Sequence, residues 1–315
     1  MDKKIDIRNG DALELFKTIK DNCIDLIVAD PPYNLNKDYG NQSDSKTFAE
    51  YIQFTEDWTR EAKRVLKPTG TIYVFMGFRF ISYLYQILEK SQKLHFNNWI
   101  CWYYTQGIGK TKGFSARHDD ILMFTKTEKF TFNLDDIRVP QKFYRSVNNM
   151  RGANPGDVWE FSHIHYCQEN RQNHPTQKPE GLIERMVLAS SNIGDTVLDP
   201  FSGSGTTIRV CQQLNRNCIG FELNSEYVQM TEVRLKIPFT GFDSIDPRME
   251  RLPNDLNNDK IREEYLLNHI EWFLKNHNEA IDVFYKEVEA KYGHKIAKQK
   301  QKISSTQKSL FDYFE

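Results

Sequence analysis

The 315-residue chain lacks any apolar run long enough to cross a membrane, and its start, Met1-Asp2-Lys3-Lys4, lacks the apolar region of a signal peptide. We therefore expect a soluble protein of the cytoplasm. An excess of either charge is also absent, because 42 basic residues stand against 43 acidic ones. Any positive surface that binds a polyanion must then be local.

Cysteine is scarce, and its pattern argues against two classes of protein. The five cysteines are odd in number and show no metal-ligand spacing, and the scattered histidines add none. We therefore expect neither a disulfide framework nor a metal centre. Most of the cysteines lie in apolar segments, which predicts reduced and packed thiols; they are Cys23, Cys101, Cys167, Cys211 and Cys218.

Apolar segments of strand length alternate with amphipathic segments of helix length from residue 5 to residue 237. This alternation predicts an α/β fold in which helices cover both faces of one sheet. The expected strands are residues 5–8, 26–29, 71–76, 98–104, 120–125 and 218–221, with a further strand starting at Thr196. The expected helices are residues 12–19, 48–66, 81–89 and 206–214.

One expected strand runs directly into the motif Asp30-Pro31-Pro32-Tyr33. The two prolines remove backbone donors, so the carbonyls around them can accept hydrogen bonds from a ligand. If Asp30 and the Pro31 carbonyl each accept one hydrogen of a nucleobase amine, the nitrogen lone pair is aimed at a sulfonium methyl group. Tyr33 would then stack on a base that has left the double helix. The alternative is a Pro-Pro turn with a tyrosine packed for structural reasons.

A second motif follows the strand that starts at Thr196. Residues 199–205 form a glycine-rich turn in which Gly203 and Gly205 let the backbone approach a ligand over the start of the next helix. The strand after that helix ends on Glu222, whose carboxylate can bind both hydroxyls of a ribose. The pattern predicts a nucleoside cofactor. A nicotinamide dinucleotide is the alternative, but the third glycine of its fingerprint is missing.

In this order, the two motifs resemble those of the permuted group of S-adenosylmethionine-dependent DNA amino-methyltransferases. Residues 9–13, 66–75 and 174–179 also resemble segments of that family, so the resemblance covers about residues 5–237. It implies a circularly permuted, doubly wound and mostly parallel sheet, S-adenosylmethionine as the cofactor and double-stranded DNA as the substrate. It further implies base flipping, within a restriction-modification system or as a stand-alone modification.

The resemblance also implies roles for individual residues. Asp11 is expected at the adenine of the cofactor, Lys178 at its methionine carboxylate and Phe201 close to it. The implied catalytic residues are Asp30, Pro31, Pro32 and Tyr33. The implied cofactor-binding residues are Asp11, Asp30, Lys178, Asp199, Phe201, Ser202, Gly203, Gly205, Thr206 and Glu222.

In this family an Asp at the head of the catalytic motif is more usual for N6 of adenine, and a Ser for N4 of cytosine. Asp30 therefore favours adenine. Both bases present a similar edge to a carboxylate and a carbonyl, so cytosine-N4 methylation stays an alternative. A DNA-binding relative without catalysis and an RNA-modifying enzyme are two further alternatives.

Three segments are candidates for contact with DNA. Residues 126–173 mix cations with amide and aromatic side chains and lie where the resemblance places target recognition. Residues 107–113 form a glycine-rich basic loop suited to phosphates. The polar segment 36–46 is expected to be a mobile loop that closes over an everted base. Ordinary solvated loops are the alternative. The expected DNA-binding residues are Lys110, Lys112, Arg138, Lys142, Arg145 and Arg151.

The composition changes after the catalytic domain of residues 1–237. Residues 238–303 predict a helical appendage and tether, whose apolar stripe is consistent with packing on the main domain, DNA binding or homodimer formation. Residues 304–315 form a tail whose Q-x-x-L-x-x-Y-F spacing resembles peptides that dock on sliding clamps. A tail that packs on its own protein is the alternative. The clamp hypothesis concerns Gln307, Leu310, Phe311, Tyr313 and Phe314.

Overall fold

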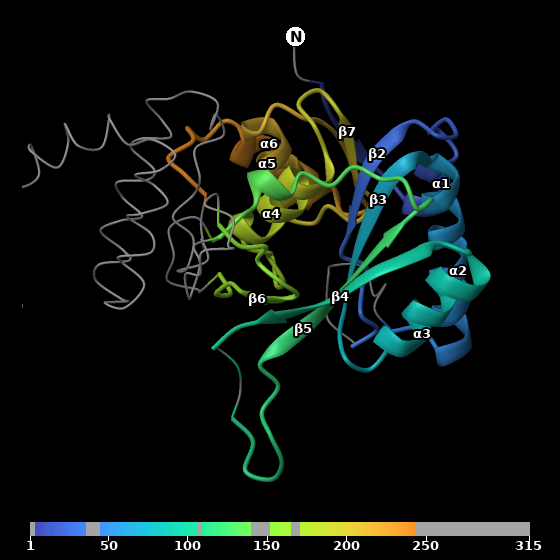
Figure 1. The fold of residues 1–315 in the computed structure, drawn as a ribbon, viewed down its shortest axis with the longest axis vertical. Helices are drawn as coiled ribbons and strands as arrows, with labels where there is room; N and C mark the ends of the chain where they lie inside the picture. Colours follow the sequence, from blue (N-terminus) through green and yellow to red (C-terminus); the bar gives the residue numbers. More distant parts are fainter. Residues whose placement is uncertain are drawn as a thin grey trace, which may run out of the picture. The chain divides into compact units, whose positions relative to one another are not determined.

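A computed structural model describes residues 4–35, 45–105, 107, 109–139, 152–164 and 171–242 (Figure 1). The chain divides into two compact units, one of Met1–Ile137 with Pro155–Met249 and the other of Arg138–Asn154 with Glu250–Glu315. The sheet belongs to the first unit. The predicted appendage and tail, from residue 243 onward, lie outside the described residues.

Within the described residues the sheet has eight strands in the order β1-β8-β7-β2-β3-β5-β4-β6. Neighbours from β1 to β3 are parallel, β5 is antiparallel to both β3 and β4, and β6 is parallel to β4. The predicted α/β fold with a mostly parallel sheet is confirmed. The strands are β1 (Ile5–Asn9), β2 (Ile24–Ala29), β3 (Leu66–Met76), β4 (His95–Tyr103), β5 (His118–Thr125), β6 (Val158–Glu160), β7 (Thr196–Asp199) and β8 (Asn217–Glu222).

Helices cover both faces of the sheet (Figure 1). Alternate residues of β3 separate the two cores: Val74 packs in one core with Trp58, and Phe75 packs in the other with Met186. One face carries α1 (Ala12–Phe16), α2 (Phe48–Val65) and α3 (Ile81–Gln86), and the other carries α4 (Glu180–Ser190), α5 (Thr206–Gln213) and α6 (Ser225–Leu235). This doubly wound arrangement leaves the ends of the strands, rather than their faces, open to a ligand.

Among the boundaries that differ from the predictions, three have a clear local cause. β3 begins at Leu66 instead of residue 71, because the backbone is extended from the end of α2 and Leu66 pairs with Ile24 across an irregularity in the ladder. α1 ends at Phe16 instead of residue 19, because residues 17–19 close tighter turns with i→i+3 hydrogen bonds. α3 ends at Gln86 and continues as a π-helical turn, Ile87–Ser91. None of these differences changes the strand order.

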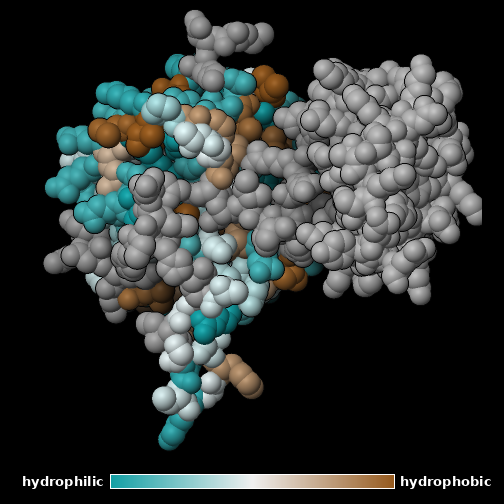
Figure 2. All heavy atoms as spheres, turned by 90° about the vertical axis from the view of Figure 1, so that its left-hand side faces the viewer, coloured by the Kyte–Doolittle hydropathy of each residue, from teal (hydrophilic) through white to brown (hydrophobic). Residues whose placement is uncertain are grey.

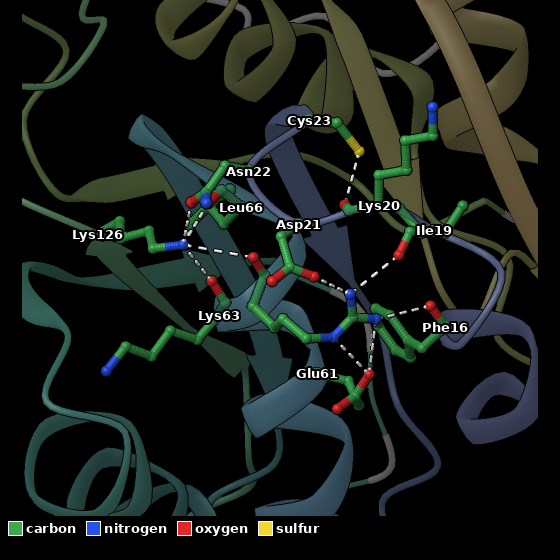
Figure 3. Close-up of polar contacts among 11 residues, drawn as sticks. Phe16, Ile19, Lys20, Asp21, Asn22, Cys23, Glu61, Lys63, Leu66 and Lys126 are labelled. Carbon is green, nitrogen blue, oxygen red and sulfur yellow. Dashed lines mark hydrogen bonds and ion pairs between the residues drawn. The ribbon is translucent and has the colours of Figure 1, made fainter.

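The end of α2 is bound by the side chain of Lys126 (Figure 3). Its ammonium donates to the carbonyls of Lys63 and Leu66 at 2.7 and 2.6 Å, and to Asn22 Oδ1 at 2.8 Å. Carbonyls at a helix C-terminus have no partner within the helix and carry partial negative charge. Burial lowers the pKa of Lys126, and the nearby Lys63 adds to this effect. Lys126 therefore contributes to the fold.

Replacing Lys126 with methionine is expected to lower the free energy of unfolding by roughly 1–3 kcal/mol, because several carbonyls lose a charged donor. Denaturant unfolding of the full chain measures this. Lys129→Met is a matched control, since Lys129 is exposed three residues further on, and it should leave the unfolding midpoint in place. Equal midpoints for Lys126→Met and the unaltered chain would contradict the proposed role.

Candidate active site

Four adjacent parallel strands end in carboxylates at the same edge of the sheet. Following the strand order β1, β8, β7 and β2, these acids are Asp11, Glu222, Asp199 and Asp30. Glu222 and Asp199 are the last residues of their strands, whereas Asp30 follows β2 directly and Asp11 comes two residues after β1. Because the strands are parallel, their carboxyl ends meet at one edge, which we call the carboxylate edge.

A single cavity at the carboxylate edge is lined by all four acids. It also contains most of the residues that the sequence predicted: every predicted cofactor residue except Gly205, and two of the four predicted catalytic residues, Asp30 and Pro32. Pro31 is buried beside them. The predicted residues that the cavity brings together are Asp11, Asp30, Pro32, Lys178, Asp199, Phe201, Ser202, Gly203, Thr206 and Glu222.

Asp30 is held by a lysine far away in the sequence. Lys178 Nζ donates to Asp30 Oδ2, and the two side chains are only 11% and 22% exposed. Asp30 Oδ1 is buried, and no described residue donates to it. The Lys178 ammonium also lies 5.6 and 5.1 Å from the ring centroids of Tyr33 and Phe75. One carboxylate oxygen is thus fixed, and the other can accept a hydrogen from a ligand.

The Pro-Pro turn is fixed by α2. The hydroxyl of Tyr51 donates to the carbonyl of Pro32 at 2.8 Å. The predicted acceptor for an amine was the carbonyl of Pro31, and no described residue donates to that oxygen. Two residues of the predicted catalytic motif therefore keep an acceptor that no described residue uses. They are Asp30, which lines the cavity, through Oδ1, and its buried neighbour Pro31, through the carbonyl.

Beyond the motif, the side-chain amide of Asn34 exchanges two hydrogen bonds of 2.8 Å with the backbone of Lys46. Lys46 also lines the cavity, which the sequence did not predict. The intervening residues 36–44, predicted to be a loop that closes over a base, lie outside the described residues.

The glycine-rich turn needs both of its glycines. Gly203 and Gly205 have φ of 49° and 75°, a left-handed conformation that favours glycine. A Cβ on Gly203 would lie 2.8 Å from the His174 ring, and one on Gly205 would lie 2.3 Å from Thr231. Gly205 therefore serves the close packing of α5 on α6 and does not line the cavity. His174 does line it, a contact that scattered histidines did not reveal in the sequence.

Backbone donors hold Glu222 and Asp11, the acids at the carboxyl ends of β8 and β1. The Glu222 carboxylate accepts from the N–H groups of Gly203 and Asn224, both at 2.8 Å. Burial raises the pKa of Glu222, and these hydrogen bonds oppose the rise. Asp11 caps α1 by accepting from Leu13 N at 2.9 Å. Both side chains are thereby oriented before any ligand arrives.

Asp199 lies fully buried between the other acids. Burial raises the pKa of Asp199 to about 7, and the carboxylates of Asp30 and Glu222 add to the rise. Hydrogen bonds from Thr207 and from the N–H of Phe201, at 3.0 Å, oppose it. Because Asp30 and Glu222 each disfavour a negative charge on Asp199, this part of the cavity favours a ligand that carries positive charge.

The raised pKa of Asp199 predicts a pH dependence of stability. In the unfolded chain the group titrates near 3.8, so the folded state retains the proton up to about pH 7 and loses relative stability as pH rises between these values. In Asp199→Asn this loss is absent. The unfolding free energy of the variant minus that of the unaltered chain should therefore increase by a few kcal/mol from pH 4 to pH 8. Parallel pH profiles from denaturant titrations would contradict the assignment.

A buried ion network supports the glycine-rich turn from behind, and the sequence did not indicate it. Glu180 Oε1 pairs with Arg209 Nε at 3.0 Å and with Arg234 Nη2 at 2.8 Å. Arg234 Nη1 also donates to the carbonyl of Ser204 at 2.9 Å and to the hydroxyl of Thr206 at 3.0 Å. These five residues connect α4, α5 and α6 to the glycine-rich turn and so fix the position of the turn.

The predicted DNA-binding residues are only partly described. Lys110 and Lys112 are exposed on the connection between β4 and β5. Arg138, in the second unit, donates to the carbonyl of Gly152 at 2.9 Å. The remaining predicted DNA and clamp residues lie outside the described residues; they are Lys142, Arg145, Arg151, Gln307, Leu310, Phe311, Tyr313 and Phe314.

Two features are absent from the described part of the chain. It contains no cluster of three or more His, Cys, Asp or Glu side chains that could hold a metal ion. None of the helices described has both the length and the apolar character needed to span a bilayer.

Comparisons with known proteins agree with this geometry. The family model described as DNA methylase, of the N6/N4 methyltransferases, matches residues 24–233. The type II methyltransferase M.HpaI of Haemophilus parainfluenzae is 58% identical over 315 residues, which are 99% of this chain and 100% of that protein. The DNA adenine methyltransferase YhdJ of Escherichia coli is 37% identical over 245 residues, 73% of this chain and 82% of that one.

A solved structure shows the same fold. The crystal structure of the M1.HpyAVI-SAM complex matches with a TM-score of 0.56 and 26% identity, over 74% of this chain and 100% of that chain. The residues matched by the family model include both the Asp-Pro-Pro-Tyr motif and the glycine-rich turn, and both segments contribute residues to the one cavity. The chain belongs to the N6/N4 DNA methylase family.

Proposed function

We propose that this chain transfers the methyl group of S-adenosylmethionine to N6 of adenine at a specific site in double-stranded DNA. The observation that carries the proposal is Asp30, which follows β2 directly and has one buried oxygen that no described residue reaches. Asp30 lines the same cavity as the glycine-rich turn. An amine acceptor and a cofactor turn in one cavity are what methylation of a base requires.

The residues present fit S-adenosylmethionine. Ser202 Oγ is buried in the cavity lining with no described partner, and Glu222 stands at the end of β8, where an acid can bind ribose hydroxyls. The acidic cavity suits a cation, and the M1.HpyAVI neighbour was solved as its SAM complex. When bound, the cofactor supplies an electrophilic methyl group on a positively charged sulfur. Asp11, Lys178 and Phe201 keep the roles that the resemblance implies, at adenine, methionine carboxylate and cofactor surface.

The chain's own groups position the amine. Asp30 Oδ1 and the Pro31 carbonyl each accept one N–H, so the remaining lone pair of the nitrogen is directed into the cavity. Tyr33 stacks on the everted base. Lys178 holds Asp30 Oδ2 and so fixes the orientation of this carboxylate. No strong base is needed, because the amine is activated by position and hydrogen bonding.

Adenine is supported over cytosine by the Asp at the head of the motif and by the name of the relative YhdJ, a DNA adenine methyltransferase. The type II name of the relative M.HpaI supports a role as the modification enzyme of a restriction-modification system. That role places the protein in the cytoplasm with the DNA.

Labelled S-adenosylmethionine and unmethylated DNA test the proposal. The purified full chain should label DNA, and digestion to nucleosides should place the label in N6-methyladenine. Methylation-sensitive sequencing of the same DNA should report one recurring sequence. Label in N4-methylcytosine would overturn the choice of base, transfer only to RNA would overturn the substrate, and no transfer to any nucleic acid would overturn the enzyme.

A further inference from the structure

The connection between β4 and β5, residues 104–117, stands out from the carboxylate edge (Figure 1). β3 runs parallel to β2, so the end of β3 at Met76 lies at the same edge as Asp30. Met76 pairs with Asp120 near the start of β5, and Tyr103 at the end of β4 pairs with His118. The connection therefore leaves the sheet at the edge that holds the catalytic motif. We call residues 104–117 the β4–β5 arm.

The β4–β5 arm has the side chains of a surface that binds a polyanion. It carries Lys110, Lys112 and Arg117 and no acidic residue. Phe114 is 99% exposed, the most exposed of the large apolar side chains described. Figure 2 shows the arm standing clear of the body with mostly hydrophilic to neutral colours. A fully exposed phenyl ring among cations favours a partner that offers both phosphates and flat rings for stacking.

Hydrogen bonds hold the base of the β4–β5 arm, so the tip of the arm has a defined position. The N–H of Tyr104 donates to the carbonyl of Arg117 at 2.9 Å, and Arg117 Nη1 donates to the carbonyl of Gly107 at 3.0 Å. Further out, the N–H of Lys110 donates to Ser115 Oγ at 2.9 Å. These bonds join the outgoing and returning halves of the arm at two levels.

The length of the arm suits a groove of the double helix. Fourteen residues give two limbs of about six residues, which reach at most roughly 20 Å at about 3.3 Å per residue. The major groove is about 12 Å wide and 8.5 Å deep and admits a two-stranded ribbon. An arm of this length at the carboxylate edge can therefore reach the bases of a duplex whose target base lies in the cavity.

We propose that the β4–β5 arm is a DNA-binding element in which Phe114 inserts between bases beside the target and stabilises its everted state. Lys110 and Lys112 bind the flanking phosphates. This inference rests on the proposed function, since it takes the duplex to lie across the carboxylate edge. It adds a residue outside the cavity that stabilises the duplex after a base has left the stack.

The first test compares Phe114→Ala with Phe132→Ala. Phe132 is 41% exposed and follows β5 at the opposite edge, where Thr131 N bonds to Thr69 O, so it serves as the matched control. The duplex carries the sequence found by methylation mapping, with 2-aminopurine at the target position. Loss of base stacking by Phe114→Ala should raise the dissociation constant roughly tenfold or more. It should also reduce the 2-aminopurine fluorescence at saturating protein, whereas Phe132→Ala should match the unaltered chain in both.

The second test separates the cations from the ring. In Lys110→Gln/Lys112→Gln the slope of log affinity against log salt should become shallower by about 0.9 for each lost phosphate contact. The fluorescence at saturating protein should stay at the unaltered level, because Phe114 is still present. Phe114→Ala should show the opposite combination, with an unchanged salt slope and reduced fluorescence.

Outcomes of these tests are distinct from a failure of the proposed function. If the unaltered chain methylates the duplex and Phe114→Ala equals it in affinity and fluorescence, the arm proposal fails and the enzyme stands. If the unaltered chain methylates no DNA, the proposed function fails first. Binding of anionic vesicles that is lost in Phe114→Ala, together with unchanged DNA affinity, would assign the arm to a membrane and overturn the DNA role. Equal melting temperatures of the variants show that the fold is retained.

Discussion

Replacing Asp30 with alanine is expected to abolish methyl transfer while the protein stays folded. Asp30 Oδ1 is the buried acceptor that no described residue uses, and its loss removes the group that we propose to orient the amine. Removing one preorganised hydrogen-bonding partner of a reacting group lowers kcat by about 10²- to 10³-fold. Asp30→Ala also leaves Lys178 without its partner in the cavity, so the effect should reach the detection limit. Asp30→Asn keeps one acceptor and should retain measurable activity.

The assay for these variants measures transfer and binding separately. Single-turnover methylation gives the rate, and calorimetry with S-adenosylhomocysteine gives the cofactor dissociation constant, which should change far less than the rate. Asp57→Ala is the control, since Asp57 pairs with Arg60 on the surface of α2 at 2.6 Å. Asp30→Ala activity equal to that of the control would show that the amine is activated elsewhere.

The row of acids at the carboxylate edge shows how much of the site the sequence could predict. Asp30, Asp199 and Glu222 each come directly after the apolar residues of a strand, and such positions can be read from the sequence without a structure. Parallel strands then bring their carboxyl ends to one edge. Local pattern and one topological rule were therefore enough to predict one cavity, and the structure places these residues around it.

Pairings between distant side chains could not be predicted in the same way. Lys178 and Asp30 are 148 residues apart, and Glu180 meets Arg209 and Arg234 from three different helices. Such contacts leave no periodic pattern in the sequence, because they depend on how the folded helices and strands pack against one another. For the same reason, composition alone does not show which cations can bind DNA. Lys126 begins a segment rich in cations, yet its ammonium binds the end of α2 and is not available to DNA.

Lys178→Met is expected to lower kcat by about 10- to 100-fold and to change the cofactor dissociation constant much less. The reason is the contact with Asp30: without the cation, Asp30 stands beside Asp199 and Glu222 with no opposing charge and is no longer held through Oδ2. A misplaced catalytic group costs about 10²-fold for a displacement near 1 Å. Lys178→Arg restores the charge and should recover part of the rate.

Separate measurements of kcat and of cofactor binding distinguish this positioning role from a structural one. The rate at saturating cofactor should fall in Lys178→Met and partly return in Lys178→Arg, because the contact with Asp30 Oδ2 is lost in the first variant and kept in the second. Lys67→Met is the matched control, because Lys67 pairs at 2.7 Å with Asp25, which lies near the opposite end of strand β2. That variant should keep both the rate and the cofactor dissociation constant. If Lys178→Met instead weakens cofactor binding strongly and leaves kcat unchanged at saturation, Lys178 acts only on the methionine carboxylate, and the pairing with Asp30 has no part in catalysis.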